Sequence, residues 1–143
     1  RAYGVFCYDY TLNATSLFYH NSLSKIHIKN QVRSIDILPT ILEILKIPID
    51  ENYLKFDGLS LMPILNGENP PRIAFSQSGN PLNSGKPPKE PNVWAVRTDD
   101  WKFIFNVHDG TEELYDLQND PNEINNLIDI EPEISIKLRL KLN

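Results

Sequence analysis

The chain has 143 residues, of which 41% are hydrophobic and 23% are charged, a composition typical of a globular domain with its own core. Its 14 Lys and Arg residues against 19 Asp and Glu residues give a net charge of -5 without a basic stripe, so nucleic acid is not an expected partner. No run approaches the roughly 18 to 20 apolar residues that cross a bilayer, so no membrane span is expected. These features leave the compartment open between periplasmic, extracellular and cytoplasmic.

Cys7 is the single cysteine, which excludes a disulfide within the chain. Its neighbours Val5, Phe6 and Tyr8 are apolar or aromatic, and this predicts a small buried thiol rather than a reactive one. The chain opens with Arg1 and enters an apolar pattern without a cap or turn signal. We therefore expect this sequence to be part of a larger protein.

Two short strands are expected early in the chain. Residues 14–19 are mostly apolar or β-branched, as in a buried strand. Ile26 and Ile28 alternate with polar neighbours, as in a half-buried strand.

Two helices are expected next. An apolar stripe predicts a helix from about Leu38 to Lys46, which Pro48 then ends because its ring cannot continue the helix. After a turn at residues 57–58, Ser60 is expected to cap a short helix that runs to Leu65. Gly67 supplies the left-handed exit from that helix.

The second half of the chain predicts an antiparallel sheet. The strand-like runs are 72–78, 93–97, 101–107 and 113–117, and turn residues separate the last three of them. Residues 79–92 form a loop rich in Gly, Pro, Asn and Lys, and its length makes it a candidate lid over a pocket. A sheet of four strands needs a helix against one face to bury its apolar side.

The helix that comes next in the chain is expected to take that role. Asp120, Pro121 and Glu123 form a capping box, which predicts a helix from Pro121. In the tail, alternating apolar residues favour a strand, whereas Pro132 and the Lys- and Arg-rich end favour a helix. We favour the helix for the tail.

Four stretches carry a family resemblance in a fixed order: Ser34–Leu45, Asp57–Gly67, Ala95–Ile104 and Glu113–Glu123. The first stretch has an Asp and a Pro-Thr pair ahead of a leucine-rich helix, and the second has an Asp-Gly followed by Ser-Leu. The third is a predicted hairpin, and the fourth is the segment that leaves it. This order and spacing resembles the C-terminal portion of the sulfatase family, in the alkaline-phosphatase-like superfamily. The resemblance is weakest before Ser34 and in the loop at 79–92.

The resemblance implies an α/β fold: the end of an alkaline-phosphatase-like α/β core, followed by a small subdomain of four antiparallel strands and a helix. Residues 1–70 would be the C-terminal piece of the core, and residues 71–143 the subdomain. The rest of the sulfatase core would then be the partner of this chain.

Sulfatases, by this resemblance, use a formylglycine made from a Cys/Ser-x-Pro-x-Arg motif beside a calcium ion held by Asp and Asn side chains. Cys7 is followed by Tyr8–Thr11, which lacks the Pro and the Arg. The acidic residues are scattered at turns and caps, and the three histidines have no ligand spacing. We therefore expect no catalytic residue and no metal ligand in this chain, and assign calcium and formylglycine to the complete protein.

Tyr3–Leu12 resembles the family segment in which a Lys or His approaches the sulfate or metal just ahead of a Tyr-acid pair. Tyr8 and Asp9 match that pair. At the expected cation this chain has Tyr3 or Gly4, which departs from the pattern. The substrate-binding candidates of this segment are Tyr3, Tyr8 and Asp9.

Arg97 is the fourth substrate-binding candidate. Together with Lys102 it flanks a predicted hairpin turn, from which a cation could reach a sulfated substrate. A solvated cross-strand role is the favoured interpretation of both cations.

The leading hypothesis for function is a sulfuric ester hydrolase whose substrate is a small-molecule or carbohydrate sulfate ester, with this chain inactive by itself. One alternative is a phosphodiesterase or phosphonate-ester hydrolase of the same superfamily. Another is a non-catalytic binding module built on the C-terminal sheet and its loop. A shared fold does not specify the ester.

Overall fold

A computed structural model describes residues 6–48, 55–81, 86 and 88–142. Its contacts group the chain into two compact units, which we describe separately. The sheet unit comprises the described residues up to Thr15 and from Ile73 onward, and the helical unit comprises those from Ser16 to Arg72. The expected assignment of residues 1–70 to a hydrolase core and of 71–143 to a subdomain stays a prediction.

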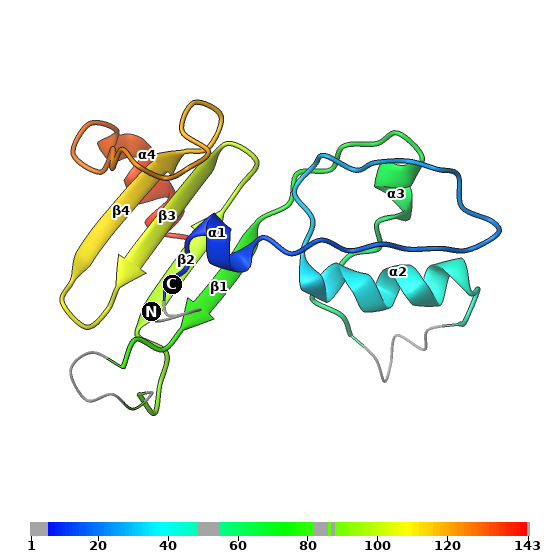
Figure 1. The fold of residues 1–143 in the computed structure, drawn as a ribbon, viewed down its shortest axis with the longest axis horizontal. Helices are drawn as coiled ribbons and strands as arrows, with labels where there is room; N and C mark the ends of the chain where they lie inside the picture. Colours follow the sequence, from blue (N-terminus) through cyan, green and yellow to red (C-terminus); the bar gives the residue numbers. More distant parts are fainter. Residues whose placement is uncertain (1–5, 49–54, 82–85, 87, 143) are drawn as a thin grey trace. The chain divides into compact units, whose positions relative to one another are not determined.

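The sheet unit contains four strands: β1 (Ala74–Ser78), β2 (Val93–Arg97), β3 (Trp101–Asn106) and β4 (Thr111–Asp116). Each strand pairs antiparallel with the next along the chain, in the order β1-β2-β3-β4 (Figure 1). The predicted meander is therefore confirmed, with the bounds of β2 as expected and those of the other three shifted by one or two residues. Aromatic and β-branched residues dominate the central strands β2 and β3, because such side chains pack well on a pleated surface.

Both faces of the sheet are covered, and alternation along β2 and β3 divides the core between them. One face buries Val93, Ala95 and Ile104 against Cys7, with Tyr8 packed alongside. The opposite face buries Val96 and Phe103 against the C-terminal helix. The short helix α1 (Asp9–Leu12) thus follows directly on the segment that covers the first face (Figure 1).

Helix α4 (Pro132–Arg139) covers the second face, which confirms the helical interpretation of the tail. Its Pro132 occupies the first turn, where a missing N–H costs no intrahelical hydrogen bond. Leu138 is buried against Val96 and Phe103, while Ile136 is 60% exposed. A helix buries the apolar residues Ile134 and Leu138 together against the sheet. This burial favours the helix, although the alternating apolar residues of the tail also fit a strand.

The helix predicted from Pro121 does not form, and that prediction is wrong. Residues 117–131 make turns, and Glu123 has a left-handed backbone with φ of 54°. The Asp120 carboxylate does accept backbone hydrogen bonds as a cap would, but from Ile124 and Asn125 at 2.8 and 2.7 Å. Tertiary contacts of Glu123, described below, hold it out of the helix that a capping box favours.

The helical unit contains the 3-10 turn η1 (Ser34–Asp36), α2 (Ile37–Ile44) and α3 (Met62–Leu65). The expected helix near residues 38–46 therefore begins one residue earlier and ends two residues earlier, with Pro39 in its first turn. Helix α3 starts after Leu61, while Ser60 Oγ accepts the N–H of Met62 at 3.2 Å. Gly67 ends this segment in the left-handed region with φ of 91°, as predicted.

Side chains of the Asp and Thr in the first resembling stretch fasten α2 to the segment before α3. Asp36 Oδ1 accepts the backbone N–H of Leu59 at 2.9 Å, and Thr40 Oγ1 accepts that of Leu61 at 2.9 Å. Arg72 closes the arrangement with an ion pair to Asp36 at 2.9 Å. Asp36 and Thr40 therefore stabilise the fold of the helical unit.

The two early strands predicted at residues 14–19 and at Ile26 and Ile28 are absent. These residues are extended or irregular, and the side chains of Leu17 and Tyr19 are each 91% exposed. A strand needs a neighbour for its backbone hydrogen bonds, and no other strand is described in the helical unit. No helix among the described residues is long and apolar enough to cross a bilayer.

Candidate functional site

The sequence-predicted residues Tyr8, Asp9 and Arg97 come together on the face of the sheet that Cys7 covers. The register places Arg97 opposite Lys102, and Lys102 opposite Tyr115, so these side chains share that face. We call Tyr8, Asp9, Arg97, Lys102, Glu113, Tyr115 and Glu123 the polar face cluster; its members come from the α1 segment, from β2, β3 and β4, and from the turns after β4.

Asp9 binds both cations of the hairpin. Its Oδ2 lies 3.0 Å from Arg97 Nη2, and its Oδ1 lies 2.8 Å from Lys102 Nζ. Burial raises the pKa of Asp9, but hydrogen bonds from Arg97 and Lys102 and their charges outweigh burial and hold the pKa below its ordinary value. Asp9 is therefore a carboxylate that organises the two cations.

Lys102 is fully buried, so the expectation that it is solvated is wrong. Its ammonium lies 2.8 Å from Asp9 Oδ1 and 2.8 Å from Glu123 Oε1. A buried ammonium is tolerated where carboxylates compensate the lost hydration, and here two do so. The Arg97 side chain stays 27% exposed and also donates from Nη1 to the Thr98 carbonyl at 3.0 Å.

Two phenols share the carboxylate of Glu113. Tyr8 Oη and Tyr115 Oη donate to its Oε2 at 2.7 and 2.6 Å, and Asn106 Nδ2 donates to its Oε1 at 3.1 Å. Burial, and then the hydrogen bond to Glu113, raise the pKa values of both tyrosines, so both phenols stay protonated donors. This contact ties Tyr8 to β4.

The remaining sequence candidates lie elsewhere. Tyr3 falls outside the described residues. Cys7 is fully buried with Sγ 3.9 Å from the Val93 carbonyl, as the sequence predicted. Across the described ranges, no group of three or more His, Cys, Asp or Glu side chains converges in a way that could hold a metal ion.

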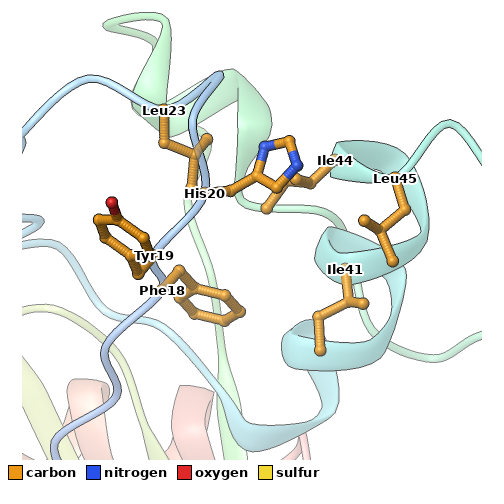
Figure 2. Close-up of a pocket in the computed structure, with 7 residues that line it drawn as sticks. All are labelled: Phe18, Tyr19, His20, Leu23, Ile41, Ile44 and Leu45. Atoms are coloured by element: carbon orange, nitrogen blue, oxygen red, sulfur yellow. The ribbon is translucent and has the colours of Figure 1, made fainter.

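The helical unit has an apolar hollow of ≈ 120 Å³, shown in Figure 2. Residues of α2 form one side and the segment before it forms the other; the lining is Phe18, Tyr19, His20, Leu23, Ile41, Ile44 and Leu45. Tyr19 and His20 carry the polar rings of this lining, and His20 Nδ1 contacts Ser22 Oγ at 2.7 Å. No Lys or Arg lines this hollow to receive a sulfate, so the polar face cluster is the better candidate site.

Sequence reasoning missed Glu113, Tyr115 and Glu123 as members of the cluster, and favoured a solvated role for Lys102. The alternation of β2, β3 and β4 places Arg97, Lys102 and Tyr115 on one face, and this signal was available once the strands were aligned. No local pattern indicates that Glu123 reaches Lys102, because that contact depends on a left-handed turn.

The family model for the C-terminal region of N-sulphoglucosamine sulphohydrolase matches residues 6–143. Arylsulfatase K from Canis lupus familiaris is 31% identical over 128 residues, which cover 80% of this chain and 22% of that protein. This chain therefore spans about a fifth of the length of that relative.

Solved structures give the same class. A sulfatase structure from Bacteroides thetaiotaomicron is similar with a TM-score of 0.59 and 27% identity, over 75% of this chain and 23% of that one. The phosphonate monoester hydrolase of Agrobacterium radiobacter shares the fold, with a TM-score of 0.58 and 22% identity over 80% of this chain and 25% of that one. The expected fold class, the C-terminal region of an alkaline-phosphatase-like hydrolase, is thus confirmed. Within this class, the chain belongs to the sulfatase family, of which it represents the C-terminal portion.

Proposed function

We propose that this chain completes a sulfatase, that the complete protein hydrolyses a sulfate ester, and that residues 1–143 alone are inactive. The observation that carries the proposal is the match of the sulfatase C-terminal family model to residues 6–143. The substrate is then a small-molecule or carbohydrate sulfate ester, in keeping with the names of the matching family and of arylsulfatase K.

The family resemblance implies a formylglycine nucleophile and a calcium ion, and the residues that the structure describes fit neither. Cys7 is buried in the core and lacks the Pro and Arg of the formylglycine motif. Asp9 is ion-paired with Arg97 and Lys102, and Glu123 with Lys102, so these carboxylates do not converge on an open site. We derive no step through either group and assign both to the rest of the complete protein.

Within that protein, the polar face cluster is proposed to form one wall of the substrate cleft. Arg97 is held by Asp9 and is 27% exposed, so its guanidinium is oriented at the surface of the cluster, where a sulfate can approach. Tyr8 and Asp9 remain substrate-binding candidates with Arg97, and Tyr3 remains one on the resemblance alone. These residues bind and orient the ester, while bond cleavage takes place on groups from elsewhere in the protein.

The rest of the sulfatase core is the proposed partner of the helical unit. Leu38 on α2, Leu45 at its C-terminal end and Leu59 are 52%, 51% and 56% exposed. Exposed apolar residues of this kind stabilise a protein when another element covers them. This supports a role in which the chain completes a larger core.

The test is enzymatic. The longest open reading frame that contains this chain is expressed together with a formylglycine-generating enzyme, and release of inorganic sulfate from 4-nitrocatechol sulfate is measured. Sulfate release by the complete protein and none by residues 1–143 are the expected results. Hydrolysis of a phenyl phosphonate monoester without sulfate release would instead favour the phosphonate-ester alternative, for which the shared fold of the Agrobacterium enzyme is the supporting observation.

A further inference from the structure

The segment that carries Tyr8 and Asp9 is docked on the sheet by side chains. Its backbone-to-backbone hydrogen bonds are local, from Thr11 and Leu12 to the Tyr8 carbonyl and from Asn13 to the Asp9 carbonyl. Among the described residues, none of these bonds joins residues 6–15 to a strand. The position of the segment therefore depends on the side chains that reach it.

Glu123 contacts this segment once directly and once through Lys102. Its Oε2 accepts the backbone N–H of Asp9 at 2.7 Å, and its Oε1 lies 2.8 Å from Lys102 Nζ, which in turn lies 2.8 Å from Asp9 Oδ1. One carboxylate thus satisfies the first N–H of α1, which has no partner within its own helix. The same carboxylate is also linked through Lys102 to the side chain of Asp9.

These contacts are buried. The side chains of Lys102 and Glu123 are 0% and 2% exposed, whereas that of Asp9 is 19% exposed. Water competes poorly for such bonds, and the loss of one partner leaves a desolvated charge behind.

The backbone at Glu123 is unusual in a way that serves these contacts. Its φ of 54° lies in the left-handed region, which a residue with a β-carbon seldom occupies. Such a conformation persists where the surroundings over-determine it, and it is typical of sites where a side chain must be aimed. Here it accompanies the carboxylate contacts with Asp9 and Lys102 and the loss of the predicted helix from Pro121.

We propose that Glu123 and Lys102 are positioning residues that lock the Tyr8–Asp9 segment onto the sheet and so fix its substrate-binding side chains. The inference rests on the proposed function, because Tyr8 and Asp9 act on substrate only in the complete sulfatase. Neither Glu123 nor Lys102 touches substrate; both act through Asp9. The Glu113–Tyr8 contact holds the preceding residue in the same way.

The experiment compares Glu123→Ala and Glu123→Gln in the complete sulfatase. Alanine removes both the acceptor for the Asp9 N–H and the charge facing Lys102, whereas glutamine keeps an acceptor of the same length and loses the charge. The matched control is Glu112→Gln, which breaks an ion pair with Arg139 whose side chain is 56% exposed. Hydrogen exchange of the peptide over residues 6–15, and KM and kcat with 4-nitrocatechol sulfate, are measured for each.

We expect exchange in residues 9–13 to rise in the order wild type, Glu123→Gln, Glu123→Ala, by about tenfold or more for alanine, while β3 amides keep their rates. KM should rise severalfold with a smaller change in kcat, because the segment binds the ester rather than cleaving it. The control should leave both readouts unchanged. If Glu123→Ala does not fold, the isosteric Glu123→Gln alone carries the test.

Exchange that rises equally in β3 and in residues 9–13, or that does not rise at all, overturns the proposal, as does a local rise with KM unaltered. If the wild-type protein releases no sulfate, the proposed function has failed independently. The docking role of Glu123 is then judged from the exchange data alone, where a rise confined to residues 9–13 supports it and a uniform rise overturns it.

Discussion

The carboxylate of Asp36 lies 2.9 Å from Arg72 Nη1, with 0% and 1% of the two side chains exposed. Arg72 also donates to the carbonyls of Leu59 and Ser60 at 3.0 and 2.8 Å, and Asp36 accepts the N–H of Leu59. This buried ion pair, with its hydrogen bonds, thus holds the segment before α3 against the start of α2.

Asp36→Asn is expected to lower the free energy of unfolding of the helical unit by about 3 kcal/mol, because it leaves the buried Arg72 without its counter-charge. Both tryptophans belong to the sheet unit, so urea unfolding followed by far-UV circular dichroism is the suitable measurement. Asp57→Asn, at an exposed position of the same unit, is the control and should have little effect. Equal losses in the two variants would contradict the role given to the pair.

The Asp36→Asn penalty should depend on pH. Burial raises the pKa of Asp36, but hydrogen bonds from Arg33 and the Leu59 N–H, and the charges of Arg33 and Arg72, outweigh burial and lower the pKa overall. A carboxyl with a lowered folded pKa stabilises fully above its unfolded value of about 3.9, and this contribution is lost as the pH falls through the folded value. Urea titrations should therefore show a constant penalty above about pH 5 and a shrinking one below about pH 4. A penalty that grows on acidification would show that the Asp36 charge does not stabilise the fold.

Gly58 is required by close approach of the backbone. A β-carbon there would lie 1.9 Å from the carbonyl oxygen of Ile35 and 2.5 Å from its carbonyl carbon, so the backbone itself would have to move. Gly58→Ala should cost about 3 kcal/mol or more in free energy of unfolding. Gly67→Ala is the matched control: its φ is 91° but nothing lies within 4 Å, so strain of about 1–2 kcal/mol is the whole expected cost. Circular dichroism during urea unfolding measures both, and the same cost at both sites would refute the steric argument.

The sheet was predictable because its central strands, β2 and β3, are rich in aromatic and β-branched residues and turn residues separate β2, β3 and β4. In such runs the side-chain pattern alone predicts a strand, and the observed β2 has the bounds that were predicted. The same reasoning failed at residues 14–19, where the apolar composition is real but no partner strand is available in the helical unit. Composition indicates what can become a strand, whereas pairing decides whether it does.

The polar face cluster was predictable only in part, because its contacts also depend on partners that are distant in sequence. Tyr8, Asp9 and Arg97 were selected from resemblance and position, but Lys102 was interpreted as a solvated surface residue. Lysine is rarely buried without a partner, so its burial depends on Asp9 and Glu123, which are distant in sequence. At Glu123 the capping-box pattern predicted a helix, and the buried contacts with Lys102 and with the Asp9 N–H prevail over that local preference.

Cys7 should be unreactive in the folded protein. Its side chain is fully buried, and burial raises the pKa of the thiol, although the charge of Lys102 offsets part of that rise. Because the thiolate is the reactive form, its reaction with 5,5′-dithiobis(2-nitrobenzoate) should be at least about tenfold slower in the native chain than in urea. Native and unfolded rates that agree would place the thiol at the surface and contradict its position in the core.

Tyr8 and Glu113 should be energetically coupled. Tyr8→Phe removes the 2.7 Å hydrogen bond to Glu113 Oε2 and is expected to cost about 1–2 kcal/mol, since the acceptor is a charged group. In a Glu113→Gln background the same change should cost less, with a coupling energy of about 1 kcal/mol. The fluorescence of Trp94 and Trp101, both on the sheet, follows the unfolding of this unit.

Tyr10→Phe is the control for that cycle, because Tyr10 is 77% exposed and should change stability by less than about 0.5 kcal/mol. If Tyr8→Phe costs the same with and without the Glu113 carboxylate, the hydrogen bond does not hold the segment. Its docking would then depend on Asp9 and Glu123, and the coupling of the α1 segment to β4 would have to be abandoned.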